Sequence, residues 1–349
     1  MSHNITKGHI CVYPSDGTGC GMYRMAWPGN AVKKSGKTVN VLQRPARIAV
    51  DQSNKIRGID VGTAEVVVFQ RPGSYQIAEV IPLLQDQGRK VVIDMDDSLS
   101  KIHPRNPAWR VYDPRVNHKT NWMHAAKACS LADLVTVTTD ALANEYGQHG
   151  RVIIIPNHVP KSYLDISKPV NKTPIIGWAG YTATHVDDLR VTKGAINKVV
   201  SETQSRFAGF GDRNIFTELG IKLVSPHESW GFTNINEYAK RLVRFDIGLV
   251  PLKTSDFNRA KSWLKGLEYA SLGIVPVVTP IGDYLNLIDL GMAIPAETPD
   301  DWYRVVRELV EDHDMRREWS EKVRKLAANW TIEGNSFKWW DAWNSTSMV

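Results

Sequence analysis

The sequence predicts an α/β protein of two domains, each built around a parallel sheet. Short apolar runs alternate with helical patterns along the whole chain, as they do where helices connect parallel strands. A length of 349 residues is enough for two domains of ordinary size. The polar, proline-containing stretch 157–173 is the expected linker. We therefore expect domains at 1–160 and 173–330, and a C-terminal segment at 331–349.

The elements of the first half follow from these patterns. Apolar runs predict strands at 9–13, 38–42, 65–70, 90–94, 134–138 and 151–155. Amphipathic spacing predicts helices between them at 22–35, 75–88, 119–131 and 140–148.

The second half continues the alternation. Strands are expected at 174–178, 221–224, 246–250 and 274–278. Helices are expected at 187–205, 235–244, 259–272 and 301–328, with a final helix around 337–343 (FKWWDAW).

Composition narrows the class of protein. Apolar residues make up 42% of the chain and charged residues 23%, as in folded globular proteins. Cys11, Cys20 and Cys129 show neither metal-ligand spacing nor an even disulfide set, which predicts a reducing compartment. The polar opening residues and the lack of a long apolar run predict a cytoplasmic protein without a transmembrane segment. A net charge of +6 favours an anionic partner.

The segment 257–279, FNRAKSWLKGLEYASLGIVPVVT, predicts a helix that leads into a buried strand. Asn258 is the expected N-cap. Asn258, Lys261, Lys265 and Glu268 are spaced three, four and three apart, so they share one face of that helix. The pattern therefore gathers an amide, two cations and a carboxylate.

The charges on this face point to a ligand. Arg259 and Lys261 would lie at the positive end of the helix dipole, where a cation is disfavoured by about 0.3–1 kcal/mol. An anion bound there would reverse the effect, because backbone N–H groups and both cations would converge on it. Glu268 could then accept hydrogen bonds from a sugar hydroxyl. Phosphate plus hydroxyl suggests a nucleotide; the alternative is a solvated amphipathic helix with ordinary surface lysines.

Several segments together resemble GT-B glycosyltransferases, especially glycosyltransferase family 4. The run DIGLVPL (246–252), then FNRAKS and LKGLEYASLGIVPVV, is similar to the donor-binding segment of that family. RVIIIPNHVP (151–160) resembles the strand and turn that leave the first domain, and IIGWAGYTATHVDDL (175–189) the glycine turn that opens the second. The resemblance implies two Rossmann-like domains facing a cleft, with a C-terminal helix that crosses back to the first domain.

The resemblance also implies roles for single residues. Glu268 matches the glutamate that holds the donor ribose, and Asn258, Lys261 and Lys265 would face the donor diphosphate. Gly180 would belong to the donor-binding glycine turn. The chain departs from the family at Ala260, where a second glutamate is expected. For the cations that many relatives place after the glycine turn, the available candidates are His185 and Lys193.

A glycine-rich turn follows the first strand. Gly17, Gly19 and Gly21 allow close approach of the backbone to a ligand. A dinucleotide site would want an acidic residue at the end of the next strand, where Gln43 and Arg44 stand, so NAD is disfavoured although an arginine could suit NADP. The GT-B resemblance places this loop beside the transferred sugar, with Gly19 and Gly21 as donor-binding residues; the alternative is a structural turn.

Three carboxylates follow the strand at 90–94. Asp94, Asp96 and Asp97 stand at its carboxyl end, where open α/β sheets place their sites. They could bind a divalent cation, bond sugar or acceptor hydroxyls, or cap a helix. We favour the hydroxyl role without a metal, with Asp94 and Asp97 as catalytic candidates beside Lys261.

The segment 100–124 combines cations with aromatic rings. Such a mixture suits a polyanionic acceptor, with bases or sugars stacked on the rings. The acceptor-binding candidates are Arg105, Trp109, Arg110 and Tyr112. The alternative is a solvated loop whose aromatic side chains pack on the domain.

These inferences combine into one functional prediction. We expect a retaining glycosyltransferase that moves a hexose or pentose from a nucleoside-diphosphate sugar, UDP- or GDP-linked, to an acceptor hydroxyl, without a tightly bound cofactor. Lys261 would stabilise the departing diphosphate. The acceptor is left open between a hydroxymethylated DNA base, a protein and a glycan. The alternatives are a nucleotide-sugar epimerase of the same fold and a non-catalytic nucleic-acid-binding protein.

Overall fold

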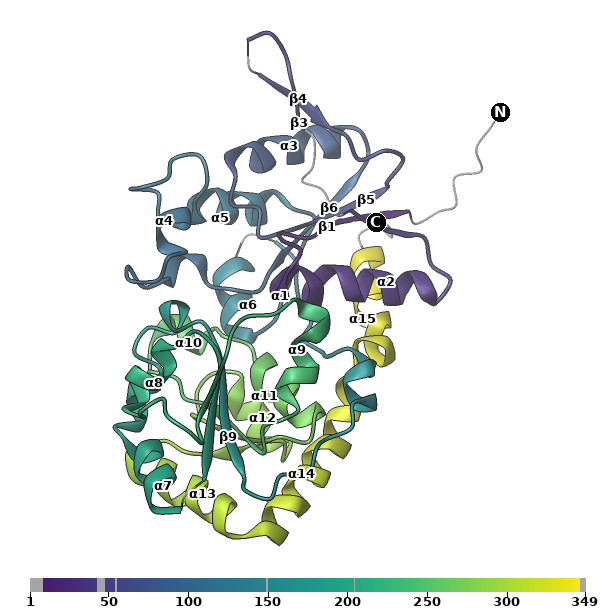
Figure 1. The fold of residues 1–349 in the computed structure, drawn as a ribbon. Coiled ribbons are helices and arrows are strands. Elements are labelled where there is room, and N and C mark those ends of the chain that lie inside the picture. Colours follow the sequence, from purple (N-terminus) through teal and green to yellow (C-terminus); the bar gives the residue numbers. More distant parts are fainter. Residues whose placement is uncertain (1–8, 43–47, 54, 149, 204, 346–349) are drawn as a thin grey trace. The chain divides into compact units, whose positions relative to one another are not determined.

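The computed structural model describes residues 9–42, 48–53, 55–148, 150–203 and 205–345 (Figure 1). These residues form two compact units. The first unit comprises the described residues up to His158, together with Ala260–Ser262 and the segment from Ile332 onward. The second comprises Val159–Arg259 and Trp263–Thr331. Among the described residues, no helix has the length and apolar content needed to cross a membrane.

The first unit contains a six-stranded parallel sheet in the order β2-β1-β5-β6-β7-β8. Its strands are β1 (Ile10–Tyr13), β2 (Val39–Val41), β5 (Val66–Gln70), β6 (Lys90–Met95), β7 (Leu134–Val137) and β8 (Val152–Ile154). All six predicted strands of the first half are confirmed. A short antiparallel pair, β3 (Ile48–Val50) and β4 (Ile56–Ile59), was not predicted. Gln43 and Arg44, on which the NAD argument rested, lie outside the described residues.

Helices of the first unit begin at side-chain caps where the sequence supplies them. They are α1 (Gly19–Gly21), a π-helical turn (Met22–Ala26), α2 (Trp27–Lys34), α3 (Tyr75–Asp86), α4 (Trp109–Tyr112), α5 (Trp122–Leu131), α6 (Asp140–Tyr146) and α15 (Ile332–Asn344). Ser74, Asn121 and Thr139 cap α3, α5 and α6 by accepting backbone N–H bonds.

The C-terminal helix completes the core of the first unit. Helix α15, yellow in Figure 1, packs against α2. Its Trp339 and Trp343 are fully buried with Val12, Val66 and other strand residues. The return of the last helix to the first domain, which the resemblance implied, is therefore present.

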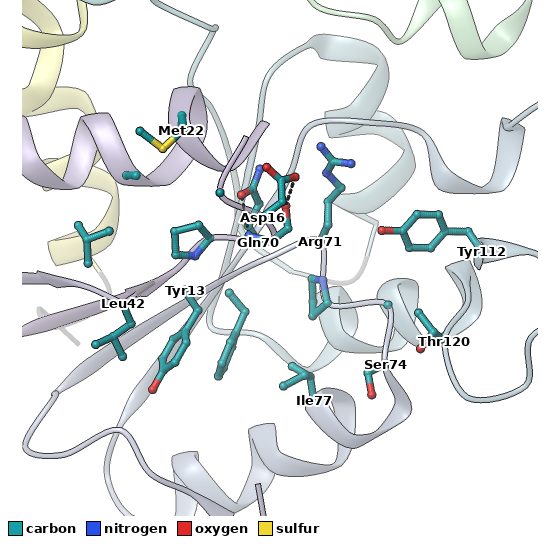
Figure 2. Close-up of a pocket in the computed structure, with 18 of the residues that line it drawn as sticks. Tyr13, Asp16, Met22, Leu42, Gln70, Arg71, Ser74, Ile77, Tyr112 and Thr120 are labelled. Carbon is teal, nitrogen blue, oxygen red and sulfur yellow. Dashed lines mark hydrogen bonds between the residues drawn. The ribbon is translucent and has the colours of Figure 1, made fainter. Parts of the chain in front are cut away.

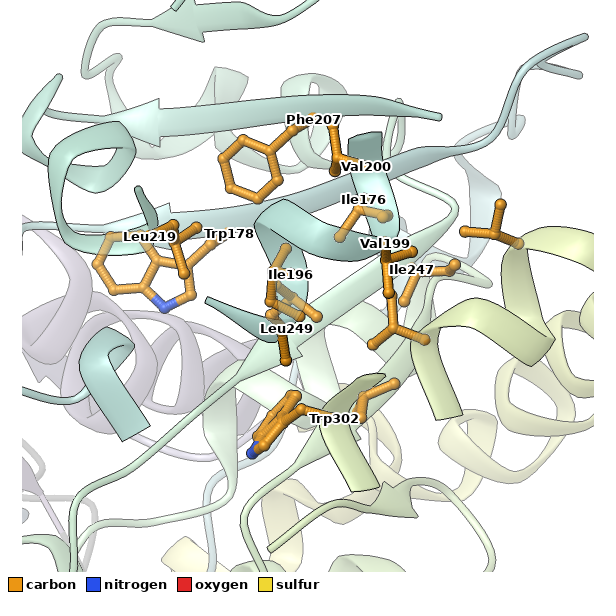
Figure 3. Packing of buried hydrophobic residues seen from close by; sticks show 14 of the residues in the cluster. Ile176, Trp178, Ile196, Val199, Val200, Phe207, Leu219, Ile247, Leu249 and Trp302 are labelled. Carbon is orange, nitrogen blue, oxygen red and sulfur yellow. The ribbon is translucent and has the colours of Figure 1, made fainter. Parts of the chain in front are cut away.

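The second unit is also built around a parallel sheet, in the order β11-β10-β9-β12-β13-β14. Its strands are β9 (Ile175–Gly180), β10 (Arg206–Gly211), β11 (Glu228–Trp230), β12 (Ile247–Val250), β13 (Val275–Val278) and β14 (Ile294–Pro295). Its helices are α7 (Ala195–Thr203), α8 (Asn214–Leu219), α9 (Ile235–Leu242), α10 (Asp256–Arg259), α11 (Leu264–Ser271), α12 (Tyr284–Asp289), α13 (Pro299–Glu311) and α14 (His313–Ala327). Figure 3 shows how Trp178, Phe207 and Trp302 pack with aliphatic side chains in the core of this unit.

Several predicted elements of the second half were wrong in whole or in part. No strand forms at 221–224; Ile221 is buried, but Leu223 and Val224 are exposed. The predicted helix 187–205 is a 3-10 turn (Leu189–Thr192) followed by α7. The predicted helix 301–328 divides at Asp312, whose side chain accepts a bond from the Met315 N–H and so caps α14.

Candidate functional site

In the second unit, the end of strand β9 brings a lysine against the backbone. Gly180 is the last residue of β9, and its φ of +154° suits glycine. A Cβ there would lie 2.8 Å from the Trp178 ring and 3.2 Å from Lys265 Nζ. The Lys265 ammonium lies 4.4 Å from the centroid of the Trp178 ring, a cation–π contact. Gly180 thus lets a cation reach the carboxyl edge of the sheet.

A hydrogen-bonded chain extends from this lysine. Lys265 Nζ lies 3.3 Å from Nε2 of His185, and His185 Nδ1 lies 2.9 Å from Oδ2 of Asp188. An ammonium can only donate, so Nε2 accepts, and the ring proton on Nδ1 is assigned to the bond with Asp188. The arrangement therefore holds a neutral imidazole between a cation and a carboxylate.

The same carboxylate fixes the predicted Asn258. Asp188 is 1% exposed, and its Oδ1 accepts from Asn258 Nδ2 at 2.7 Å and from the Lys253 N–H at 2.9 Å. Asn258, His185 and Lys265 are thus joined through Asp188. Asn258, His185 and Lys265 were predicted as candidates from the sequence, whereas Asp188 was not.

The helix expected at 259–272 is interrupted, which corrects part of the sequence argument. Helix α10 ends at Arg259 and α11 begins at Leu264. Asn258 is not an N-cap, because it lies inside α10. The interruption coincides with a bond to a residue that is distant in sequence: the Trp263 N–H donates to Asp283 Oδ2 at 3.0 Å.

The break redistributes the cations. Arg259 occupies the last turn of α10, where the helix dipole favours a cation. Lys265 lies in the first turn of α11, which has no side-chain cap, so the unfavourable placement of positive charge applies to Lys265. An anion at this helix end would turn that placement into a favourable one.

Glu268 lies on the same helix as Lys265, three residues on. Its side chain is 5% exposed, and Tyr238 Oη donates to its Oε2 at 3.3 Å. Burial, followed by the charge of Glu268, raises the pKa of Tyr238 well above its ordinary value, so this hydroxyl stays a donor. Glu268 therefore lies one turn from Lys265 on α11, and its buried carboxylate is hydrogen-bonded to Tyr238 of α9.

Two aromatic residues near this sheet edge were missed by the sequence argument. Tyr181 follows Gly180 directly and is 45% exposed, and Phe232 is 62% exposed. Their rings meet edge to face, with centroids 5.9 Å apart. Exposed rings at the carboxyl end of parallel strands are a surface on which a planar ligand can stack. Adjacency to the glycine turn could have indicated Tyr181, but nothing local marks Phe232.

Lys261 belongs to the first compact unit. Its neighbours fix that segment there: Thr139 Oγ1 donates to the Ala260 carbonyl at 3.2 Å, and Asn157 Nδ2 donates to Ser262 Oγ at 2.7 Å. Burial raises the pKa of Asp97, and the charge of Lys261 partly opposes that rise. Lys261 and Asp97, both catalytic candidates, therefore interact electrostatically.

Asp94, the third catalytic candidate, is enclosed in the protein. It is 0% exposed and accepts bonds from Arg24 Nε at 3.1 Å, Arg24 Nη2 at 2.6 Å and Thr136 Oγ1 at 2.7 Å. Asp96 pairs with Arg71 at 2.5 Å. Two of the three carboxylates thus face arginines, which is a different arrangement from a cluster around one metal ion.

The glycine-rich turn is held to the sheet by Gln70, the last residue of β5. The Ser15 N–H donates to Gln70 Oε1 at 3.1 Å, and Gln70 Nε2 donates to the Cys20 carbonyl at 3.1 Å. Gly21 is sterically required, since a Cβ there would lie 1.8 Å from the Asp16 carbonyl oxygen. A Cβ at Gly19 would contact nothing within 4 Å.

A pocket of about 740 Å³ opens beside this turn (Figure 2). It lies where β1, β2 and β5 end, because Tyr13, Leu42 and Gln70 contribute to its lining. Tyr112 and Thr120 line the opposite side. Of the four predicted acceptor residues, Tyr112 is the one that lines this pocket. Trp109 instead stacks with Arg115 at 5.4 Å, while Arg105 and Arg110 are exposed.

The whole chain resembles solved glycosyltransferase structures. The catalytic domain of starch synthase IV from Arabidopsis thaliana, bound to ADP and acarbose, matches with a TM-score of 0.63 and 10% identity, over 98% of this chain and 99% of that one. WaaG, a glycosyltransferase involved in lipopolysaccharide biosynthesis, matches with a TM-score of 0.60 and 13% identity, over 96% and 99%. UGT2 from Phytolacca americana, complexed with UDP-2fluoro-glucose and pterostilbene, gives 0.51 and 12%, over 98% and 100%.

No family model and no curated protein matches the sequence. Identities of 10–13% carry information on fold alone. Together with the two parallel sheets, these neighbours confirm the predicted architecture. The chain has the GT-B fold of two Rossmann-like domains.

Proposed function

We propose that the protein is a glycosyltransferase that takes a sugar from a nucleoside-diphosphate donor, with retention of configuration. In this reaction the bond between the anomeric carbon and the diphosphate oxygen breaks, and a bond from that carbon to the acceptor oxygen forms. The acceptor hydroxyl proton leaves with the nucleoside diphosphate. The fold neighbours support transfer in general, while donor and acceptor have to be argued from this chain.

The observation that carries the proposal is the pairing of Lys265 and Glu268 on α11. Lys265 places a cation at an uncapped helix N-terminus beside Gly180, a combination that suits a diphosphate. Glu268, three residues on, offers a buried carboxylate that suits ribose hydroxyls. A nucleoside diphosphate carries both a diphosphate and ribose hydroxyls, so it matches this pair of side chains.

The neutral His185 fits the same ligand. Because its Nε2 accepts from Lys265, the imidazole fixes the lysine without adding charge. Asp188 fixes the imidazole in turn, and it also fixes Asn258. We assign Asp188 and His185 positioning roles, and we assign the exposed rings of Tyr181 and Phe232 to the nucleobase, UDP or GDP being the expected donors.

Lys261 is assigned to the leaving group. A fixed positive charge stabilises the diphosphate as its negative charge develops, so no metal is required by this route. Burial raises the pKa of Asp97 despite the charge of Lys261. We therefore assign Asp97 as the candidate for an acid–base role. Asp94 is assigned a positioning role, since its oxygens bond Arg24 and Thr136.

Nucleotide binding tests the proposal directly. Titration calorimetry with UDP, GDP, ADP and dTDP should give saturable binding of at least one nucleotide. Lys265→Ala and Glu268→Gln should each lower the affinity for that nucleotide by about tenfold or more, as expected for losing one charged hydrogen-bond partner. Lys222→Ala, which removes an exposed lysine of the same unit, is the matched control.

Turnover then distinguishes transfer from binding. Release of the nucleoside diphosphate from UDP- and GDP-sugars should rise when an acceptor is added, and NMR of the anomeric proton should show retention. Equal affinity of all three variants for every nucleotide, or no nucleotide binding by the native protein, would refute the donor site.

A further inference from the structure

The pocket in the first unit has the size and place of a small-molecule site. Its volume of about 740 Å³ falls within the roughly 300–1,000 Å³ typical of such sites. It lies at the carboxyl ends of neighbouring parallel strands, where α/β sheets bind their ligands. None of the residues assigned above to the donor, Lys261, Lys265 and Glu268 among them, lines this pocket.

One wall of the pocket is apolar. The rings of Tyr13 and Phe69 stack with centroids 5.2 Å apart and an interplanar angle of 25°. The Tyr13 hydroxyl donates to the Asp60 carbonyl at 2.9 Å, so its polar atom is already bonded. Leu42, Met22 and Ile77 are further apolar residues of the lining. Apolar atoms gain most from contact with an apolar ring or chain.

The charges of the pocket oppose a polyanion. Of the described lining residues, Asp16 and Arg71 are the acid and the base. Arg71 is paired with Asp96, at 2.5 Å from its Nε and 3.1 Å from its Nη2. Its positive charge is therefore balanced, and Asp16 leaves the described part of the lining with no excess of positive charge. Nucleic acid binding relies on such an excess.

The rim can hold a hydroxyl group. Oδ1 of Asp16 accepts from the Thr18 N–H, the Thr18 hydroxyl and the Gly21 N–H, at 2.8, 2.8 and 3.2 Å. These bonds outweigh the burial of Asp16, which by itself would raise the pKa, and they lower it, so the group is ionised at neutral pH. Oδ2 accepts a single bond, from Ser15 at 3.2 Å, and has capacity for a ligand hydroxyl.

The opposite side is shaped by backbone geometry. Arg71 has a φ of +44°, a conformation that is uncommon for a residue with a side chain and that clusters at functional sites. A Cβ at Gly73 would lie 2.9 Å from the Tyr112 ring, so glycine allows Tyr112 to close that side. The pocket is thus held open by specific, strained local structure.

We propose that this pocket binds the acceptor of the proposed glycosyl transfer, and that the acceptor is a small uncharged molecule whose hydroxyl group adjoins an apolar ring system or chain. That the bound molecule serves as an acceptor rests on the proposed function. The apolar part lies on the wall of Phe69, Leu42 and Ile77, and the hydroxyl donates to Asp16. A hydroxymethylated DNA base is disfavoured by the charge balance.

Three probes separate these properties. The first is 1-naphthol, which joins apolar rings to a hydroxyl; the second is 1-naphthyl phosphate, which has the same rings and a dianionic group. The third is a duplex oligonucleotide containing 5-hydroxymethylcytosine. We expect saturable binding of 1-naphthol, followed by its fluorescence, and binding of the other two weaker by about tenfold or more.

Two variants locate the binding. Ile77→Asp places a charge in the apolar wall at the third position of α3, where the helix N-terminus favours an acidic residue, so the fold is retained. Gln76→Asp makes the same change at a neighbouring first-turn position that does not line the pocket. Ile77→Asp should lower the affinity for 1-naphthol by about tenfold or more, and Gln76→Asp should lower it by less than about twofold.

The outcomes distinguish this inference from the proposed function. Tighter binding of the phosphate or the oligonucleotide than of 1-naphthol, absence of 1-naphthol binding, or equal effects of the two variants would overturn it. Nucleotide affinity of both variants, measured by the same calorimetry, should equal that of the native protein. If Ile77→Asp has no effect on 1-naphthol binding while nucleotide binding is retained, the acceptor-pocket proposal is refuted and the donor-site proposal is not.

Discussion

Acid should weaken the folded protein through one buried histidine, His158. Its side chain is 0% exposed, Nδ1 lies 2.7 Å from the Pro156 carbonyl oxygen, and its ring meets Trp339 of α15 edge to face at 5.3 Å. Burial, and then the charge of Lys338, lowers the pKa of His158 from 6.5 to about 4. The folded protein therefore keeps this imidazole neutral well into the acidic range.

The sign of the effect follows from proton binding. Between about pH 6.5 and pH 4 the unfolded chain binds a proton at His158 that the folded chain does not, so the free energy of unfolding falls as the pH falls. Above about pH 6.5 both states are neutral and the group contributes nothing. At 1.36 kcal/mol per pKa unit, the loss across the window is about 3 kcal/mol. That is a large share of the 5–15 kcal/mol typical of folded proteins.

Urea denaturation followed by tryptophan fluorescence, at several pH values from about 7 to 4, measures this loss. His158→Gln keeps an N–H donor for the Pro156 carbonyl but does not titrate. Over this pH range the variant should therefore lose about 3 kcal/mol less free energy of unfolding than the native protein does. His313→Gln, at an exposed histidine with a side chain 65% accessible, is the control and should follow the native curve. If His158→Gln and the native protein lose stability in parallel, buried neutral His158 is not the cause.

Three further changes have expected outcomes. Arg24→Met removes one partner of a fully buried ion pair and should lower the free energy of unfolding by about 3–5 kcal/mol in urea, whereas Arg57→Met at an exposed pair should cost less than about 1 kcal/mol; equal losses would contradict the role of burial. Gly177→Ala would place a Cβ 2.2 Å from the Phe245 ring and should cost about 1–3 kcal/mol by thermal unfolding, while Gly19→Ala, with open space around its Cβ, should change stability by less than about 0.5 kcal/mol. Lys261→Ala should lower kcat for sugar transfer by about 10²–10³-fold in steady-state assays, and near-normal turnover would remove Lys261 from the leaving-group role.

The parallel sheet of the first unit could be predicted because its strands are continuous apolar runs bounded by polar turns. Strand β10 could not, since RFAGFG carries two glycines that lower strand propensity, and Gly209 is needed because a Cβ there would lie 3.0 Å from the Phe216 ring. The opposite error occurred at IKLV (221–224), where Ile221 is buried but the next three residues are exposed and no strand forms.

Candidate donor residues that lie on one helix could be predicted from the sequence. Lys265 and Glu268 share one face at a spacing of three, which local periodicity reveals. Their fixation depends on distant partners, since Asp188 bonds Asn258 across 70 positions of sequence. The helix break before Leu264 likewise coincides with a bond to Asp283, twenty positions away.

The pocket was the part least visible in the sequence. Its lining comes from the ends of β1, β2 and β5, the start of α3, and the segment that contains Tyr112. The window 69–77 supplies seven lining residues, and the others are spread between Tyr13 and Thr120. Chain topology, rather than any motif, assembles the site.

The burial of Trp339 and Trp343 in the first unit has a consequence for synthesis on the ribosome. The sheet that they cover is complete once β8 has emerged, but its tryptophan cover is translated only after the whole second unit. At about 5–20 residues per second, the delay is on the order of 10–40 s. Throughout that interval the nascent sheet exposes Val12, Val66 and Val92, so chaperones that bind apolar segments have a defined target and a defined time.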